Sequence, residues 1–156
     1  MKRIFPALAV ILILSGCDNS FDINKAEMEV TSTEYRGCKG LKSAEITDST
    51  DLVIITSLAD DNYLITHYDA SFNCCLPEGI GIEVSMSNDT LYFSEYEKVK
   101  GNCRCMCRYD VVTGIRNLDE CEYVLCIIKD YNILGTTSVL FKEGMKEEFY
   151  VSELIE

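Results

Sequence analysis

The sequence contains no tryptophan, a single histidine, and 14 basic against 26 acidic residues, so its 156 residues carry a net charge of -12. Nucleic-acid binding depends on an excess of Lys and Arg, and this balance argues against a nucleic-acid partner. The lone His67 excludes histidine-rich metal sites and leaves any Ser–His or Cys–His catalysis dependent on one side chain. The chain also lacks a glycine-rich phosphate loop and a nucleophile motif, and we therefore expect no enzymatic activity.

Cysteine, in contrast, is abundant, with nine residues in a chain long enough for one domain. The hydrophobic fraction of 47% is that of an ordinary globular protein. In an exported protein, an odd number of cysteines implies that one of them has a different role from the rest.

The first 16 residues have the pattern of an export signal. Lys2 and Arg3 precede an apolar run over residues 4–14, which is too short to span a bilayer and is typical of a signal peptide. The next residues, Leu14-Ser15-Gly16-Cys17, resemble the bacterial lipobox. That resemblance implies cleavage before Cys17, a diacylglycerol on its thiol, and a fatty acid such as palmitate on its new amine.

Processing at this position would assign the odd cysteine to a lipid anchor. Removing 16 of the 156 residues leaves 140, and 12 basic against 26 acidic side chains leave a net charge of -14. We expect residues 17–27 to form a lipidated tether and residues 28–156 to form the single domain. The protein would then be an outer-membrane lipoprotein that faces the periplasm or the cell exterior.

Hydrophobic alternation predicts strands and no helices. We expect strands over residues 28–35, 52–58, 63–68, 80–86, 103–112, 121–128 and 137–141, and one that starts with Leu91 and Phe93. Short strands at this spacing predict an all-β fold, a single-domain antiparallel β-sandwich of the immunoglobulin-like type. Leu118 and Tyr123, five positions apart at the start of a strand, fit the tyrosine corner of such sandwiches.

The eight remaining cysteines are disulfide candidates, because an exported chain folds in an oxidising compartment. Cysteines two apart in a strand lie roughly 6.6 Å apart, whereas bridged Cβ atoms lie about 3.8 Å apart. Cysteines 103, 105 and 107 therefore need partners from other segments, and a bridge between the adjacent cysteines 74 and 75 would need a strained ring. The full candidate set, with its connectivity open, is Cys38, Cys74, Cys75, Cys103, Cys105, Cys107, Cys121 and Cys126.

Two alternatives stay open for the same cysteines. One is a plain core, because the three alternating cysteines form the apolar face of a strand whose other face carries Arg104 and Arg108. The other is a thiol-based metal or redox site, which would replace an expected absence of cofactors by zinc or copper. Its ligands would be Cys74, Cys75, Cys103, Cys105, Cys107 and His67.

Other polar residues carry weaker signals. We interpret His67, which lies in a predicted strand, as structural, and the charged segment 142–148 as solvated surface. Glu95 and Glu97 share one face of a strand, but two carboxylates do not by themselves make an acid–base pair.

Three short motifs are similar to those of small predicted lipoproteins of Bacteroidota. They are Phe72-Asn73-Cys74-Cys75, Asn88-Asp89-Thr90-Leu91, and CRCMCRYDV over residues 103–111, followed by Leu118 and Tyr123. The similarity covers residues 63–128 and implies an exported, lipid-anchored β domain but no reaction. It also implies O-glycosylation at Ser49 and Thr90, which follow aspartates as in the acceptor pattern of that phylum.

The sequence therefore predicts a binding or structural module of the cell envelope. Its lipid would attach it to the membrane, and its protein or glycan partner is left open.

Overall fold

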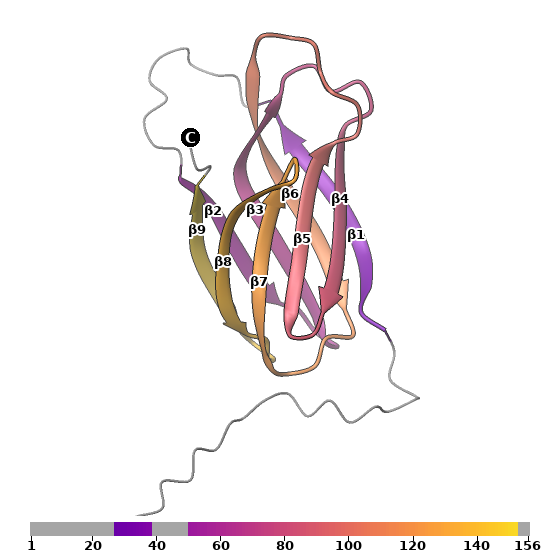
Figure 1. The fold of residues 1–156 in the computed structure, drawn as a ribbon. Helices are drawn as coiled ribbons and strands as arrows, with labels where there is room; N and C mark the ends of the chain where they lie inside the picture. Colours follow the sequence, from indigo (N-terminus) through magenta and orange to yellow (C-terminus); the bar gives the residue numbers. More distant parts are fainter. Residues whose placement is uncertain (1–26, 39–49, 153–156) are drawn as a thin grey trace, which may run out of the picture.

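The computed structural model describes residues 27–38 and 50–152, which form nine β-strands in two packed sheets (Figure 1). The first sheet has the order β1-β6-β3-β2-β9 and the second the order β4-β5-β7-β8. The strands are β1 (Glu29–Gly37), β2 (Thr50–Ser57), β3 (Asn62–Asn73), β4 (Ile80–Ser87), β5 (Thr90–Glu97), β6 (Met106–Arg116), β7 (Glu122–Lys129), β8 (Asn132–Leu140) and β9 (Lys146–Ser152).

The expected all-β sandwich of two sheets is confirmed. No helix occurs in the described residues, so none there is long and apolar enough to cross a membrane. The signal segment 1–16, Cys17, the tether up to residue 26, and Ser49 lie outside the described residues.

Period-two alternation produces the core. In β5, for example, Leu91 and Phe93 point inward and are fully buried, whereas Tyr92 and Ser94 face outward and stay partly exposed. Buried residues of both sheets pack together as one cluster. One end of that cluster is aromatic, because the Phe141 ring lies edge-on to the rings of Tyr63 and Tyr123 at centroid distances of 5.0 and 5.6 Å.

The expectation of a purely antiparallel sandwich is wrong at one pair of strands. β5 and β7 pair in parallel, from Thr90 opposite Val124 to Glu95 opposite Lys129. The chain leaves β5, crosses to the other sheet as β6, and returns as β7. Because each crossing reverses the chain, β7 runs in the same direction as β5 and makes the second sheet mixed.

Several strand boundaries also differ from the sequence prediction. β3 continues past residue 68 to Asn73, and β8 begins at Asn132 rather than at residue 137. The strand expected over residues 103–112 begins only at Met106 and continues to Arg116, because residues 101–105 form a loop. The charged segment expected as surface contains the start of β9, which pairs with β2 through Lys146 opposite Thr56 and Val151 opposite Asp51. Charged side chains on an edge strand discourage pairing with another molecule. The segment can therefore be a strand and at the same time carry solvated charges.

Candidate functional site

Six cysteines lie at one end of the sandwich, where β1, β3 and β5 finish and β6 begins (uppermost in Figure 1). Two pairs among them are disulfides, Cys38–Cys107 and Cys75–Cys103, with Cα–Cα distances of 4.6 and 5.7 Å. The expectation of disulfides is thus met for these four cysteines. Cysteines 103 and 107 both pair with other segments, the first with the loop after β3 and the second with the end of β1.

The third member of the alternating cysteines, Cys105, is an exposed free thiol next to the free thiol of Cys74. The Cys74 amide donates to the Cys105 carbonyl oxygen at 3.0 Å. Partial burial, together with a hydrogen bond and the charge of Cys105, raises the pKa of the Cys74 thiol to about 11. The two side chains are therefore close together, and the Cys74 thiol is protonated at neutral pH.

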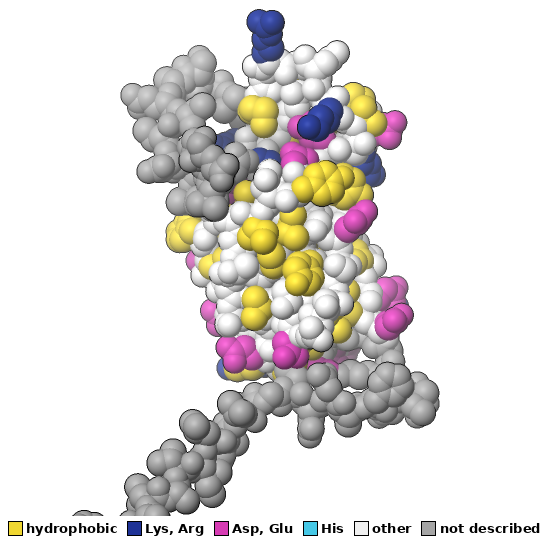
Figure 2. All heavy atoms as spheres, viewed as in Figure 1, with side chains coloured by type: hydrophobic (Ala, Val, Ile, Leu, Met, Phe, Trp, Pro, Cys, Tyr) yellow, Lys and Arg dark blue, Asp and Glu magenta, His cyan; other side chains and the backbone are white. Residues whose placement is uncertain are grey.

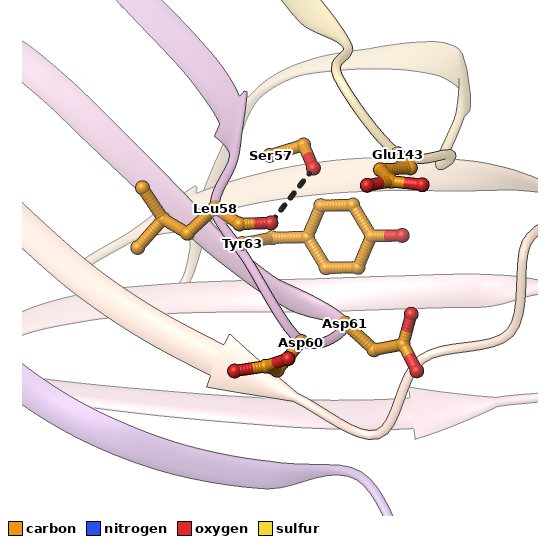
Figure 3. Close-up of a pocket in the computed structure, with 6 residues that line it drawn as sticks. All are labelled: Ser57, Leu58, Asp60, Asp61, Tyr63 and Glu143. Carbon is orange, nitrogen blue, oxygen red and sulfur yellow. Dashed lines mark hydrogen bonds between the residues drawn. The ribbon is translucent and has the colours of Figure 1, made fainter.

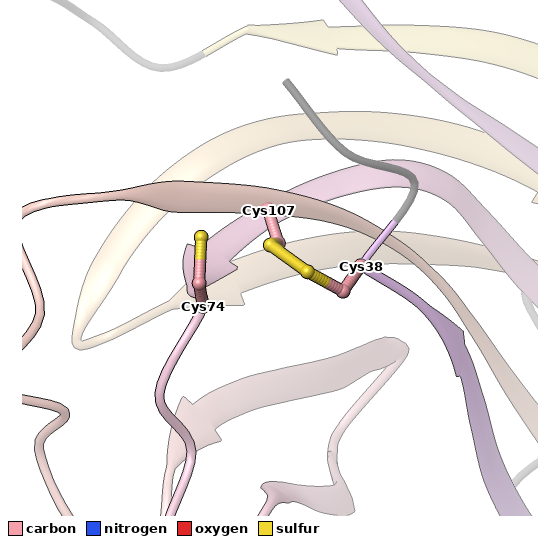
Figure 4. A group of neighbouring side chains, drawn as sticks. All are labelled: Cys38, Cys74 and Cys107. Atoms are coloured by element: carbon pink, nitrogen blue, oxygen red, sulfur yellow. A yellow bond between two sulfur atoms is a disulfide. The ribbon is translucent and has the colours of Figure 1, made fainter.

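Cys74 also lies beside a disulfide. Its sulfur and those of Cys38 and Cys107 all lie within 4.8 Å of one another, and Figure 4 shows the Cys74 side chain next to the bonded pair. With the disulfide closed, only Cys74 of these three offers a thiol. Reduction of the Cys38–Cys107 bridge would free two more thiols beside Cys74, and thiolates are ligands that zinc and copper(I) prefer.

The metal-ligand set expected from sequence is not brought together. Cysteines 75 and 103 bond to each other, and His67 lies in the core between two carboxylates. The residue missed was Cys38, which reaches the group from β1 because that strand pairs with β6 up to Gly37 opposite Tyr109.

Two further disulfide candidates lie on or before β7. Cys126 is unpaired and buried, and its strand neighbours are Tyr92 and Thr136 rather than cysteines. Burial raises the pKa of its thiol, as for a core residue. Cys121 is not a free cysteine. The glycosylation candidate Thr90 is partly buried at the start of β5.

Asn73 and Glu97 hold the loops of the cysteine-rich end in place. The Glu97 carboxylate accepts from the amides of Asn73 and Gly101 at 2.8 and 3.0 Å. The Asn73 side chain donates to the Cys103 carbonyl at 2.8 Å and accepts from the Cys75 amide at 2.9 Å. Both ends of the Cys75–Cys103 bridge are thus positioned by one buried asparagine.

A network of charged side chains lies between the sheets beside this end. His67 on β3 is 0% exposed; its Nδ1 lies 2.8 Å from Glu95 Oε2 on β5, and its Nε2 lies 3.5 Å from Asp51 Oδ2 on β2. Arg108 on β6 donates to the other Asp51 oxygen at 3.0 Å and to the Asp69 carbonyl at 2.9 Å. Asp69 lies in a bulge of β3, so the arginine ties the bulge to the network.

The network keeps its histidine charged. Burial alone would lower the pKa of His67, but hydrogen bonds to Asp51 and Glu95, together with their charges, raise it to about 9. Lys129, buried on β7, completes the group with its ammonium 5.4 Å from the centre of the Phe72 ring. Burial lowers the pKa of Lys129, while the charges of Asp130, Asp51 and Glu95 oppose that shift.

Strand parity contains a signal for this network. Glu95 lies two positions after Phe93 and four after Leu91, so its side chain points to the same inward face of β5. A charged side chain at such a core position requires a charged or hydrogen-bonding partner. The same holds for Asp51 before Val53 and for Lys129 after Ile127. Alternation along a strand cannot tell which of these side chains meet, because each contact joins two strands and the His67–Glu95 contact also joins the two sheets.

An acidic hollow of about 290 Å³ lies at the opposite end, between the β2–β3 turn and the segment before β9 (Figure 3). The Ser57 hydroxyl in its lining donates to the Leu58 carbonyl and accepts from the Gly144 amide, both at 3.1 Å. Burial, and then the charges of Glu120 and Asp61, raise the pKa of Tyr63 in its wall. The single histidine is enclosed in the core and does not reach this hollow.

The cysteine-rich end and the buried charge network adjoin each other, because Arg108 follows Cys107 and Glu97 follows Glu95 by two positions. The Cys38–Cys107 bridge links the end of β1 to the neighbouring strand β6 of the same sheet, the Cys75–Cys103 bridge links two loops, and the His67–Glu95 pair joins the two sheets. Comparison of the chain with protein-family models, curated proteins and solved structures finds no match.

Proposed function

We propose that the protein is a lipid-anchored binding module of the cell envelope, held at Cys17 and facing the periplasm or the cell exterior. The observation that carries the proposal is the sequence of Leu14-Ser15-Gly16-Cys17 directly after a basic start and a short apolar run. Closed disulfides at Cys38–Cys107 and Cys75–Cys103 support it, because such bridges persist in oxidising compartments.

The position of β1 indicates which end of the domain would lie toward the membrane. Glu29 pairs with Arg116 at one end of the sandwich, and Gly37 pairs with Tyr109 near the other, cysteine-rich end. A chain anchored at Cys17 therefore enters the domain at the end away from the disulfides. A ligand in the surrounding space would then contact the outer faces of the sheets and the cysteine-rich end.

The finer fold belongs to the same proposal. An immunoglobulin-like sandwich is supported by two packed sheets and by burial of both Leu118 and Tyr123. The parallel β5–β7 pair would make it a variant of that architecture. Kinship with small lipoproteins of Bacteroidota is supported by the cysteine motifs and would explain the signal.

The anchor is tested by replacing Cys17 with alanine and fractionating cells that express the full chain. The account predicts that the wild-type protein sediments with membranes and needs detergent for release, because two or three acyl chains bind stably. The Cys17→Ala variant is expected in the soluble fraction or as an uncleaved precursor that retains Lys2 and Arg3. A processed Cys17→Ala chain that still needs detergent would overturn the proposal, and Cys126→Ala serves as the matched control.

A second candidate, a thiol-based metal or redox protein, is favoured by one observation. The sulfurs of Cys38, Cys74 and Cys107 converge within 4.8 Å, and the Cys105 thiol neighbours Cys74. It is tested by measuring zinc and copper(I) bound by the reduced full chain. Stoichiometric metal that is lost in Cys74→Ser would favour this candidate, whereas absence of bound metal would reject a metal role.

A further inference from the structure

The outer face of the β4-β5-β7-β8 sheet carries a hollow that neither the cysteines nor the buried charges use. Figure 2 views this face and shows hydrophobic side chains gathered along it, with acidic ones mainly toward its edges. The hollow has a volume of about 270 Å³. Its lining residues are Glu83, Ser94, Glu95, Tyr96, Ile128 and Tyr131. The Glu95 side chain is enclosed in the core, so only its backbone borders the hollow.

Tyr131 is held in a conformation that a tyrosine rarely adopts. It is 95% exposed at the tip of the β7–β8 hairpin, and both turn residues, Asp130 and Tyr131, have positive φ angles, 45° and 72°. Such turns favour Asn-Gly or Asp-Gly, since glycine alone takes positive φ without strain. The folded protein thus carries an exposed aromatic ring at a position where glycine would be more stable.

The turn that carries this ring is fixed to the neighbouring strand. The Asp130 amide donates to the Glu95 carbonyl at 2.9 Å, and the Asp130 carboxylate accepts from the Glu97 amide at 3.3 Å. These bonds join the hairpin tip to the end of β5. The backbone at Tyr131 is therefore positioned before any ligand arrives, which reduces the entropy lost on binding.

The second ring of the hollow, that of Tyr96, is held in place by its own contacts. Tyr96 lies over Gly81 of β4, where a Cβ atom would collide with its ring. Its hydroxyl donates to Glu83 Oε1 at 2.8 Å. That hydrogen bond, more than burial, raises the pKa of Tyr96, so the phenol stays protonated at neutral pH. Glu83 keeps a second oxygen as an acceptor toward the hollow.

We propose that this hollow binds a neutral carbohydrate, which rests on the proposed role as an envelope binding module. A pyranose ring has an apolar C–H face that can stack on the rings of Tyr131 and Tyr96. Its hydroxyl groups can donate to the Glu83 carboxylate and exchange hydrogen bonds with Ser94. The hollow thus combines two aromatic rings and Ile128 with the polar groups of Glu83 and Ser94, which could orient such a ligand.

The negative charge at the hollow favours neutral over acidic carbohydrates. Glu83 is the charged side chain that lines the hollow, and the whole chain has a net charge of -12. Acidic sugars would meet repulsion from both, with no basic residue among the lining residues to pair with them. The volume of about 270 Å³ suits one or two sugar rings rather than a long chain.

The test uses the detergent-solubilised full chain on a printed panel of neutral and acidic oligosaccharides, followed by calorimetric titration of the strongest neutral one. The wild type is expected to bind neutral glycans, and Tyr131→Ala to weaken binding about tenfold or more. The matched control is Tyr150→Ala, a tyrosine 70% exposed on β9 of the other sheet, which should bind like the wild type.

The variant Tyr131→Gly separates function from folding. It removes the ring and relieves the positive φ, so it should lose binding like Tyr131→Ala while its thermal midpoint rises by roughly 2–5 °C. Absence of neutral glycan binding by the wild type, or unchanged binding in Tyr131→Gly, would overturn the inference. Neither result bears on the lipid anchor, which is tested by fractionation of Cys17→Ala.

Discussion

The charge of His67 depends on two carboxylates that are themselves removed from water. Its ring nitrogens lie 2.8 Å from Glu95 and 3.5 Å from Asp51, and the side chain is completely buried. A buried ion pair contributes little over a well-packed apolar core, but removing one partner leaves an uncompensated charge. The network should therefore be intolerant of single substitutions and dependent on pH.

The first prediction concerns the protonation of His67. Its pKa is raised from 6.5 to about 9 in the folded protein, so the network's stabilisation is complete below pH 6.5 and is lost as the pH rises through 9. The free energy of unfolding should fall by about 3 kcal/mol across this range, as measured by urea denaturation without reductant. Because His67 is the only histidine, its NMR signals can be followed directly; a titration midpoint at or below 6.5 would contradict the account.

Glu95→Gln tests the cause of that shift. The amide keeps the shape of the side chain but removes one negative charge, so the titration midpoint of His67 should move to lower pH. Glu83→Gln, which changes an exposed carboxylate on β4, is the control and should leave the His67 midpoint unchanged. Equal midpoints in all three proteins would show that Glu95 does not set the pKa.

A third prediction concerns the neighbouring thiols Cys74 and Cys105. Their backbones are joined by a 3.0 Å hydrogen bond, and the thiols interact directly. Mild oxidation should close a further bridge between them, whereas the buried Cys126 thiol should stay free. Peptide mapping after alkylation of the unreduced protein checks this; a bridge from Cys74 or Cys105 to Cys126 would contradict it.

At the level of strands, the alternation of hydrophobic and polar residues was sufficient to locate β4 and β5 in the sequence. The burial of β5 has a clean period of two, and β4 and β5 both lie within two residues of the predicted positions. The larger differences occur at β3, which continues through a bulge to Asn73, at β8, which begins five residues earlier than predicted, and at β9 and β6. The start of β9 carries the charges of an exposed edge, and the expected start of β6 is drawn into a loop by the Cys75–Cys103 bridge.

Contacts between strands could be predicted less well than the strands themselves. The parallel β5–β7 pair depends on the chain crossing to the other sheet, which no local pattern encodes. The partners of His67 and of Cys107 are likewise distant in sequence, 28 and 69 positions away. Parity indicates that Glu95 is buried, but only the packed sheets bring it to His67.

The fourth prediction tests whether β9 completes the sandwich. Val151 is 2% exposed, and the added Cβ of an alanine at Gly135 on β8 would lie 3.0 Å from it, so the two strands pack closely across the sheets. Val151→Asp should lower the free energy of unfolding by about 2–4 kcal/mol, because it buries an unpaired charge. The neighbouring Tyr150→Asp should have little effect, and equal effects of the two variants would argue against β9 as a core strand.

For the whole molecule, the described parts suggest a division of roles between the two ends and one face. The chain enters at the end opposite the disulfides, the His67–Glu95 pair joins the two sheets, and Tyr96 and Tyr131 line a hollow on the outer face. A net charge of -14 after removal of residues 1–16 should keep this body away from anionic headgroups. The lipid at Cys17 would then be its attachment to the membrane.

The most direct test of this account is the intact mass of the protein purified from membranes without reductant. The account predicts a chain that begins at Cys17, carries two or three acyl chains, and has lost two hydrogens for each of the bridges Cys38–Cys107 and Cys75–Cys103. A chain that retains Lys2 and Arg3 without lipid, or one in which these four cysteines are free thiols, would contradict it.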